Sequence, residues 1–76
     1  MEEFCSFTSY VPEENQLCIV TTIEGHTDIN GSMTYDAINY YIGKYSKYYS
    51  YKDTAAFIVN NAVMYFPYHT SSWKYL

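Results

Sequence analysis

A tyrosine-rich stretch, residues 34–51, constrains the fold of this 76-residue chain more than any other segment. It holds seven of the eleven tyrosines. At about 100° per residue, its apolar and aromatic side chains fall within one arc of about 160°, and only Tyr40 lies on the polar side. The stretch therefore predicts an amphipathic helix over residues 35–49. Its predicted buried face consists of Tyr35, Ala37, Ile38, Tyr41, Ile42, Tyr45, Tyr48 and Tyr49. Gly43, on the polar side, is interpreted as tolerated there or as room for the backbone of a partner.

Two segments before this stretch have the composition of strands. Residues 3–11 and 16–23 are rich in aromatic and β-branched side chains, and Pro12 opens a four-residue connection typical of a turn. Within residues 16–23, successive side chains are expected to face opposite sides of a sheet. The two segments are therefore predicted to pair as an antiparallel hairpin. Residues 24–31 contain two glycines and predict a loop, with a short strand around residues 26–29 left open.

The segment after the stretch, residues 54–66, would be apolar on both faces of a strand pair. Asn60 and Asn61 tolerate positive φ, which favours a hairpin with a type I′ turn in which Val59 faces Ala62. A helix ending at Pro67 is the alternative. Two apolar faces indicate a place in the middle of a sheet, or a hairpin that is covered on both sides. The predicted fold class is α+β: one domain over residues 1–76, with a small antiparallel sheet in the order β-β-α-β-β and the helix packed on one face.

The carboxylates are concentrated in the first half of the chain, which has a formal net charge of −4. Residues 1–38 contain seven acidic residues and no lysine, whereas all four lysines follow, and arginine is absent. A negative surface steers association with a basic partner. The acidic candidates for partner binding, expected in two clusters at the first turn and before the helix, are Glu13, Glu14, Glu24, Asp28 and Asp36.

Aromatic residues supply a second set of candidate contacts, because tyrosine and tryptophan are enriched at interface hot spots. The last ten residues are too aromatic for a loose tail, and Trp73 is expected to fold back onto a sheet edge or to lie across a partner. The aromatic candidates for partner binding are Tyr40, Tyr68, Trp73 and Tyr75.

No catalytic or metal-binding pattern is evident in the sequence. Cys5 and Cys18 are interpreted as reduced core thiols. The two cysteines and the two histidines, His26 and His69, lack the short Cys–Cys and His–His spacings that zinc sites use. A chain of this length also has little room for a substrate pocket. No enzyme activity, catalytic residue, metal or other cofactor is therefore predicted.

The predicted function is that of a non-enzymatic protein that occupies a basic surface of a larger host protein. Abundant tyrosine, asparagine and isoleucine without arginine is typical of an AT-rich genome. The sharpest hypothesis is a phage or mobile-element inhibitor of a host nucleic-acid enzyme, of the anti-CRISPR or anti-restriction type. The alternative is a small nucleic-acid-binding or regulatory module that uses tyrosines and lysines of the second half, such as Lys44, Lys47 and Lys52. A subunit that folds only with its partner is a third reading.

Charge and hydropathy also bound the partners and the compartment. Direct contact with nucleic acid is not expected, because the acidic residues outnumber the lysines and arginine is missing. The longest apolar run, residues 62–67, is too short to cross a membrane. A cytoplasmic location is predicted, in the host cytosol if the chain is phage-encoded, and a homodimer is left open.

Overall fold

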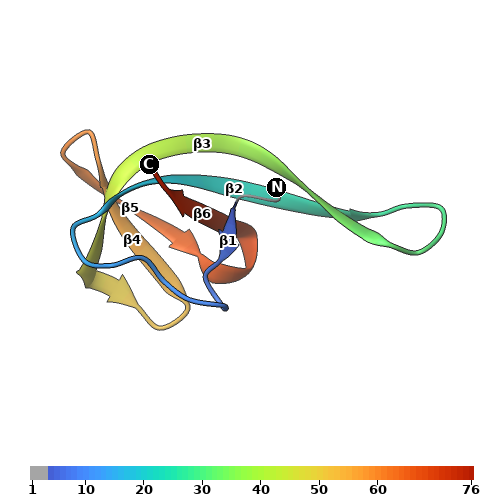
Figure 1. Cartoon of the computed structure of the whole chain (residues 1–76), viewed down its shortest axis with the longest axis horizontal. Helices are drawn as coiled ribbons and strands as arrows, with labels where there is room; N and C mark the ends of the chain where they lie inside the picture. Colours follow the sequence, from blue (N-terminus) through green and yellow to red (C-terminus); the bar gives the residue numbers. More distant parts are fainter. Residues whose placement is uncertain (1–3) are drawn as a thin grey trace.

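A computed structural model describes residues 4–76, which form one antiparallel sheet (Figure 1). These residues contain six strands, one turn of 3-10 helix and no α-helix. The order across the sheet is β1-β6-β2-β3-β4-β5, so the last strand of the chain lies between the first and the second. The elements are β1 (Cys5–Ser6), β2 (Leu17–Thr27), β3 (Met33–Tyr51), β4 (Thr54–Val59), β5 (Ala62–Pro67), η1 (Tyr68–Thr70) and β6 (Ser71–Tyr75).

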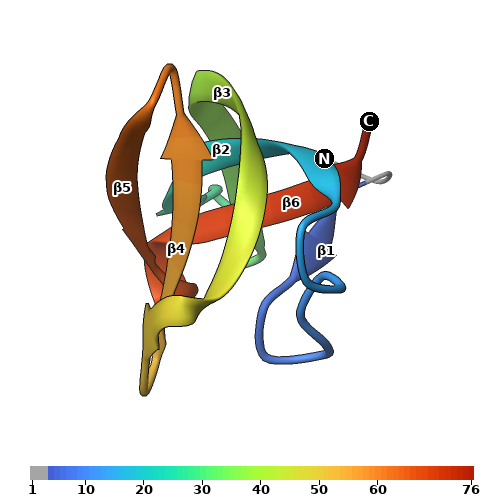
Figure 2. The same ribbon diagram turned by 90° about the vertical axis from the view of Figure 1, so that its left-hand side faces the viewer.

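The sheet curls back on itself (Figure 2). Its core is rich in aromatic side chains. Trp73 and Phe57 are fully buried, and Phe7, from the loop after β1, packs edge-on against Phe57 with ring centroids 6.1 Å apart. The Nε1–H group of Trp73 donates a hydrogen bond of 3.1 Å to the backbone oxygen of Tyr10. The loop between β1 and β2 therefore covers this core. The buried apolar residues are Phe7, Cys18, Val20, Tyr45, Ala55, Phe57, Val59, Phe66 and Trp73.

The prediction of a helix over residues 35–49 is wrong, and so is the α+β fold class, because these residues lie in β3. The strand pairs with β2 on one side and with β4 on the other: Tyr41 lies opposite Val20, and Tyr45 lies opposite Phe57. A spacing of four residues keeps side chains on one face of a helix, but it also keeps them on one face of a strand. Tyrosine and isoleucine fit strands well, and pairing with two neighbours outweighs a weak helical preference.

Burial along β3 agrees with the predicted helix face at some positions only. Tyr45 is 4% exposed and Tyr41 packs against the core, whereas Tyr40 is 62% exposed, as the sequence predicted. Five members of the predicted buried face are instead exposed, because strand alternation or the end of the sheet turns them outward. They are Tyr35, Ile38, Ile42, Tyr48 and Tyr49.

The predicted first hairpin is also wrong. Only Cys5 and Ser6 of residues 3–11 form a strand within the described residues, and this strand pairs with β6 rather than with β2. β2 confirms the predicted second strand and its alternation, with Cys18 and Val20 buried. It continues to Thr27, where a loop was predicted, because its outer half pairs with the start of β3. No separate strand at residues 26–29 is formed.

The hairpin of β4 and β5 is confirmed, and the alternative helix over these residues is wrong. Val59 lies opposite Ala62, and the two asparagines between them have φ values of 51° and 66°, as a type I′ turn requires. The expected place in the middle of the sheet is wrong for β5, which is an edge strand. Its pairing partner β4 supplies the fully buried residues Ala55, Ala56 and Phe57.

The outer halves of β2 and β3 project from the curled sheet as a two-stranded arm, residues 23–37 (Figure 1). β6 pairs with β2 only over Cys18–Thr22, and the pairing of β4 with β3 begins at Lys44. Within the described part of the chain, both edges of the arm are therefore unpaired. The projection accounts for the elongated shape, with principal extents of 42 × 22 × 18 Å.

Candidate interaction surface

The arm has one polar face and one apolar face. The register between β2 and β3 shifts after Thr22, and from there Glu24 lies opposite Asp36 and His26 lies opposite Thr34. Residues that alternate along paired strands share a face, so these four side chains form the polar face. The Nε2 atom of His26 is hydrogen-bonded to Oδ2 of Asp36 at 2.6 Å. The sequence of the arm contains no lysine or arginine, so its charged residues are carboxylates.

The apolar face carries side chains that are about half exposed. Met33 and Tyr35 lie on it, opposite Thr27 and Gly25. A Cβ atom at Gly25 would lie 2.8 Å from Cε1 of Tyr35 and 3.2 Å from Cε of Met33. The absence of a side chain at Gly25 therefore lets the tyrosine ring and the methionine lie across the opposite strand.

The turn at the end of the arm, residues 28–32, is organised by one carboxylate. Oδ1 of Asp28 accepts hydrogen bonds from the backbone N–H groups of Asn30 at 2.8 Å and Ser32 at 2.9 Å. Gly31 has a φ of 83°, which a side chain would disfavour. This turn holds Ile29 at the tip with 99% of its surface exposed. A fully exposed isoleucine on an ordered turn is a candidate anchor for a partner.

Three of the predicted acidic contacts lie on the arm, and two lie at the opposite end of β2. Glu24 and Asp36 are on the polar face, and Asp28 is committed to the turn. The carboxylate of Glu14 accepts the backbone N–H of Lys47 at 3.0 and 3.2 Å, so it stabilises the fold. The backbone N–H of Glu13 donates to the hydroxyl of Tyr75 at 2.9 Å, and the Glu13 side chain is exposed.

The predicted aromatic contacts do not form one surface. Trp73 is 0% exposed, which removes it from any surface that a partner could touch. The ring of Tyr68 stacks on Phe7 with centroids 5.3 Å apart. Tyr75 is exposed but packs edge-on against Trp73 at 4.8 Å. Tyr40 is exposed on β3, with its ring centroid 6.0 Å from that of Phe4.

Sequence reasoning missed the apolar members of the arm. The helix prediction places Tyr35 on a buried face, and Ile29 and Met33 belong to no predicted site. The signal that could have revealed them is the Asn30-Gly31 pair, since Asn-Gly between alternating segments is a strong hairpin indicator. Read in that way, the sequence from Ile23 to Ala37 becomes two paired strands around a turn.

The two cysteines are free thiols, and their surroundings differ. Cys18 is fully buried, and burial raises its pKa to about 11, so this thiol is protonated and unreactive at neutral pH. The Cys5 thiol donates to the hydroxyl of Tyr10 at 3.1 Å. Among residues 4–76, no three His, Cys, Asp or Glu residues are grouped closely enough to hold a metal ion. The described chain also has no helix with the length and apolarity to span a membrane.

No protein-family model matches this sequence, and no curated protein or solved structure shows significant similarity to the chain.

Proposed function

We propose that this protein is a non-enzymatic binding protein whose arm occupies a basic groove on a larger host protein. The observation that supports the proposal most is the form of the arm. It is a two-stranded element that extends beyond the core, carries carboxylates without lysine or arginine, and ends in an exposed isoleucine. An element that projects in this way reaches into a groove that a flat surface cannot enter.

The charge pattern supports one kind of partner. Glu24 and Asp36 lie side by side on the polar face, and apolar Met33 and Tyr35 lie on the other. Carboxylates of this kind accelerate encounter with a positive surface, whereas buried apolar side chains supply most of the affinity after docking. A positive groove with apolar walls is the common feature of proteins that bind nucleic acid. The partner we propose is therefore a host nucleic-acid enzyme, inhibited because the arm competes for its groove.

This proposal includes the biological setting inferred from composition. A phage or mobile-element inhibitor of the anti-CRISPR or anti-restriction type, acting in the host cytosol, would need only a small chain with one projecting contact element. The same arm could instead meet a second copy of the chain, and the experiment below distinguishes that case.

The test uses a pair of variants with equal net charge. Glu24→Lys with Asp36→Lys reverses the charge of the polar face, whereas Glu13→Lys with Asp53→Lys makes the same change away from the arm. Species retained by the wild-type chain from host lysate, with and without nuclease treatment, are identified. The retained proteins are purified and used for association-rate measurements at low and high salt. We expect the arm variant to associate about tenfold more slowly or worse at low salt, with a smaller difference at high salt.

The control variant is expected to remain within about threefold of the wild-type rate, and heparin is expected to displace the partner from the wild-type chain. Equal slowing by both variants would mean that net charge alone matters and would contradict a role of the arm. A retained species that is lost after nuclease treatment would instead favour the nucleic-acid-binding module. Retention of only the chain itself would identify a homodimer.

A further inference from the structure

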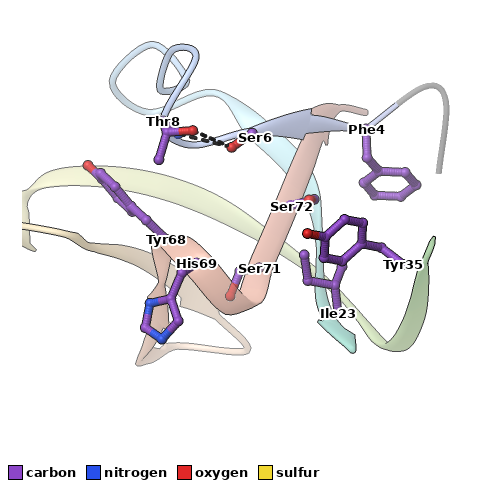
Figure 3. A pocket seen from close by; sticks show the side chains of 9 residues that line it. All are labelled: Phe4, Ser6, Thr8, Ile23, Tyr35, Tyr68, His69, Ser71 and Ser72. Atoms are coloured by element: carbon purple, nitrogen blue, oxygen red, sulfur yellow. Dashed lines mark hydrogen bonds between the residues drawn. The ribbon is translucent and has the colours of Figure 1, made fainter. Parts of the chain in front are cut away.

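A pocket, distinct from the polar face of the arm, lies where the base of the arm meets β1, η1 and β6 (Figure 3). It encloses about 460 Å³, which is within the range of small-molecule binding sites. Aromatic rings of Phe4, Tyr35 and Tyr68 contribute to its walls, and hydroxyl groups of Ser6, Ser71 and Ser72 lie between them. These residues come from the two ends of the described chain and from the arm, so only the folded sheet assembles the site.

Ser71 is the least satisfied polar group in this pocket. It is 1% exposed, and its Oγ atom has no hydrogen-bond partner among the described residues. Burial of an unpaired hydroxyl opposes folding, and such groups in native proteins are rare enough to require an explanation. Ser6 differs, because its Oγ is bonded to Oγ1 of Thr8 at 2.7 Å. Ser71 lines the pocket, but its Oγ atom is buried in the present rotamer, so a ligand can bond to it only when the side chain rotates.

The pocket is lined by apolar, hydroxyl-bearing and phenol side chains and by His69. Among residues 4–76, no lysine, arginine, aspartate or glutamate lines the pocket. The pKa of Tyr68 is raised, mainly because the phenol is partly buried, so the phenol remains protonated at neutral pH. A charged ligand would lose its hydration without gaining a partner of opposite charge. The pocket therefore suits an uncharged group that both donates and accepts hydrogen bonds.

We propose that this pocket binds a nucleobase, stacked on an aromatic wall and hydrogen-bonded along one edge to serine hydroxyls. A base is flat, uncharged and lined with alternating donors and acceptors, which single hydroxyl groups can match in either role. Binding requires Ser71 to adopt another staggered rotamer that turns its hydroxyl toward the base. The base is supplied by a free nucleoside or by an unpaired position in a single strand. This site is separate from the polar face of the arm and does not depend on the function proposed above.

The test is a titration of the ¹⁵N-labelled full chain, followed by backbone amide chemical shifts in NMR spectra. Adenosine and uridine are the first probes. Their 5′-monophosphates and a four-nucleotide single strand are further probes, and methyl glucoside is the sugar control. We expect at least one nucleoside to shift amides of η1 and β6 with a dissociation constant of about 1 mM or tighter. The monophosphate is expected to bind within about threefold of the nucleoside, because the pocket lacks a cation.

Variants separate recognition from folding. Tyr35→Ala and Ser71→Ala are each expected to weaken nucleoside binding about fivefold or more. Ser71→Ala is expected to melt at the same temperature as the wild type or higher, since it removes an unpaired buried hydroxyl. Tyr65→Ala is the matched control, because Tyr65 is exposed on β5 and does not line the pocket.

Either of two titration results would overturn the proposal. The first is an absence of shifts at η1 and β6 with every nucleoside at a concentration ten times the expected dissociation constant. The second is shifts of equal size with methyl glucoside. Unchanged binding by Ser71→Ala would show that the hydroxyl has no role in the site and would also refute it. Tighter binding of the four-nucleotide strand than of the nucleoside identifies a polymer as the source of the base, and equal binding identifies a free nucleoside. The Glu24→Lys, Asp36→Lys variant is expected to titrate like the wild type, so this result and that of the partner experiment are independent.

Discussion

Replacement of Gly43 by alanine should destabilise the protein through contact with β4. Gly43 lies in β3 opposite Cys18, with β4 on its other side. A Cβ atom there would lie 2.7 Å from Cγ2 of Val59, 2.9 Å from the backbone oxygen of Ile58 and 3.2 Å from Cβ of Phe57. The backbone oxygen cannot move away without displacing the strand. The room at Gly43 is therefore occupied by the chain's own β4, not by the backbone of a partner.

The expected loss can be estimated from two opposing effects. Alanine restricts the unfolded chain and would stabilise a strand by about 0.5–1 kcal/mol relative to glycine if it fitted. An extra carbon in a tightly packed place costs about 1–3 kcal/mol. The net loss should be about 1–2 kcal/mol, which lowers the melting temperature of a domain of this size by roughly 5–15 °C. A small domain has a thin margin, so this is a large fraction of its stability.

Guanidinium denaturation followed by tryptophan fluorescence measures this loss, because Trp73 is the one tryptophan and is fully buried. Gly25→Ala is the control. The three atoms nearest to its added carbon would belong to the Tyr35 ring and the end of the Met33 side chain, and these half-exposed side chains can move, unlike the backbone of β4. Its free energy of unfolding should change by less than about 0.5 kcal/mol. Equal or greater stability of Gly43→Ala would refute the argument that β4 approaches too closely for a side chain.

Three further predictions concern the core, the turn of the last hairpin and a buried thiol. Tyr45→Ala should lower the free energy of unfolding by about 3 kcal/mol or more in chemical denaturation, whereas Tyr40→Ala should change it by less than about 0.5 kcal/mol. Equal losses would contradict the burial of Tyr45 and the exposure of Tyr40. Asn61→Gly should stabilise by up to about 1 kcal/mol, because glycine adopts a φ of 66° without strain, and a loss would contradict the type I′ turn. Cys18 has a folded-state pKa of about 11 and ionises more easily when unfolded, so its contribution to stability should decline between about pH 9 and pH 11. This decline should be absent in Cys18→Ala, and rapid alkylation of Cys18 in the native protein would contradict its burial.

Some elements of this fold could be predicted because their signals are local. The β4–β5 hairpin follows from two adjacent asparagines between apolar segments, and β2 follows from its alternation. The pairing of β6 with β1 and β2 could not be predicted, because it joins residues from opposite ends of the chain. As a result Trp73 was expected at an edge or an interface, although it lies at the centre of the core.

The arm and the pocket were missed for a related reason. Residues 35–49 match a helix and a strand at spacings of four, and the sequence contains no residue that excludes either form. The Asn-Gly pair favours the strand, but a loop that ends before a helix accommodates the same pair. The pocket needs the arm, β1 and η1 together, so no single segment carries a sign of it.

The distribution of aromatic rings connects the fold with binding. Phe7, Phe57, Phe66 and Trp73 are buried, whereas eight of the eleven tyrosines are exposed. A phenol that enters the core must find a partner for its hydroxyl, whereas phenylalanine does not, so the chain uses phenylalanine inside and tyrosine outside. Exposed tyrosines offer large contact areas with few rotatable bonds, which favours binding over solubility. Three of the eight acidic residues, Glu24, Asp28 and Asp36, lie on the arm that carries Tyr35 and Met33 on its apolar face. Solubility alone would be served equally well by acidic residues placed anywhere, so their position on a projecting element favours a role in association.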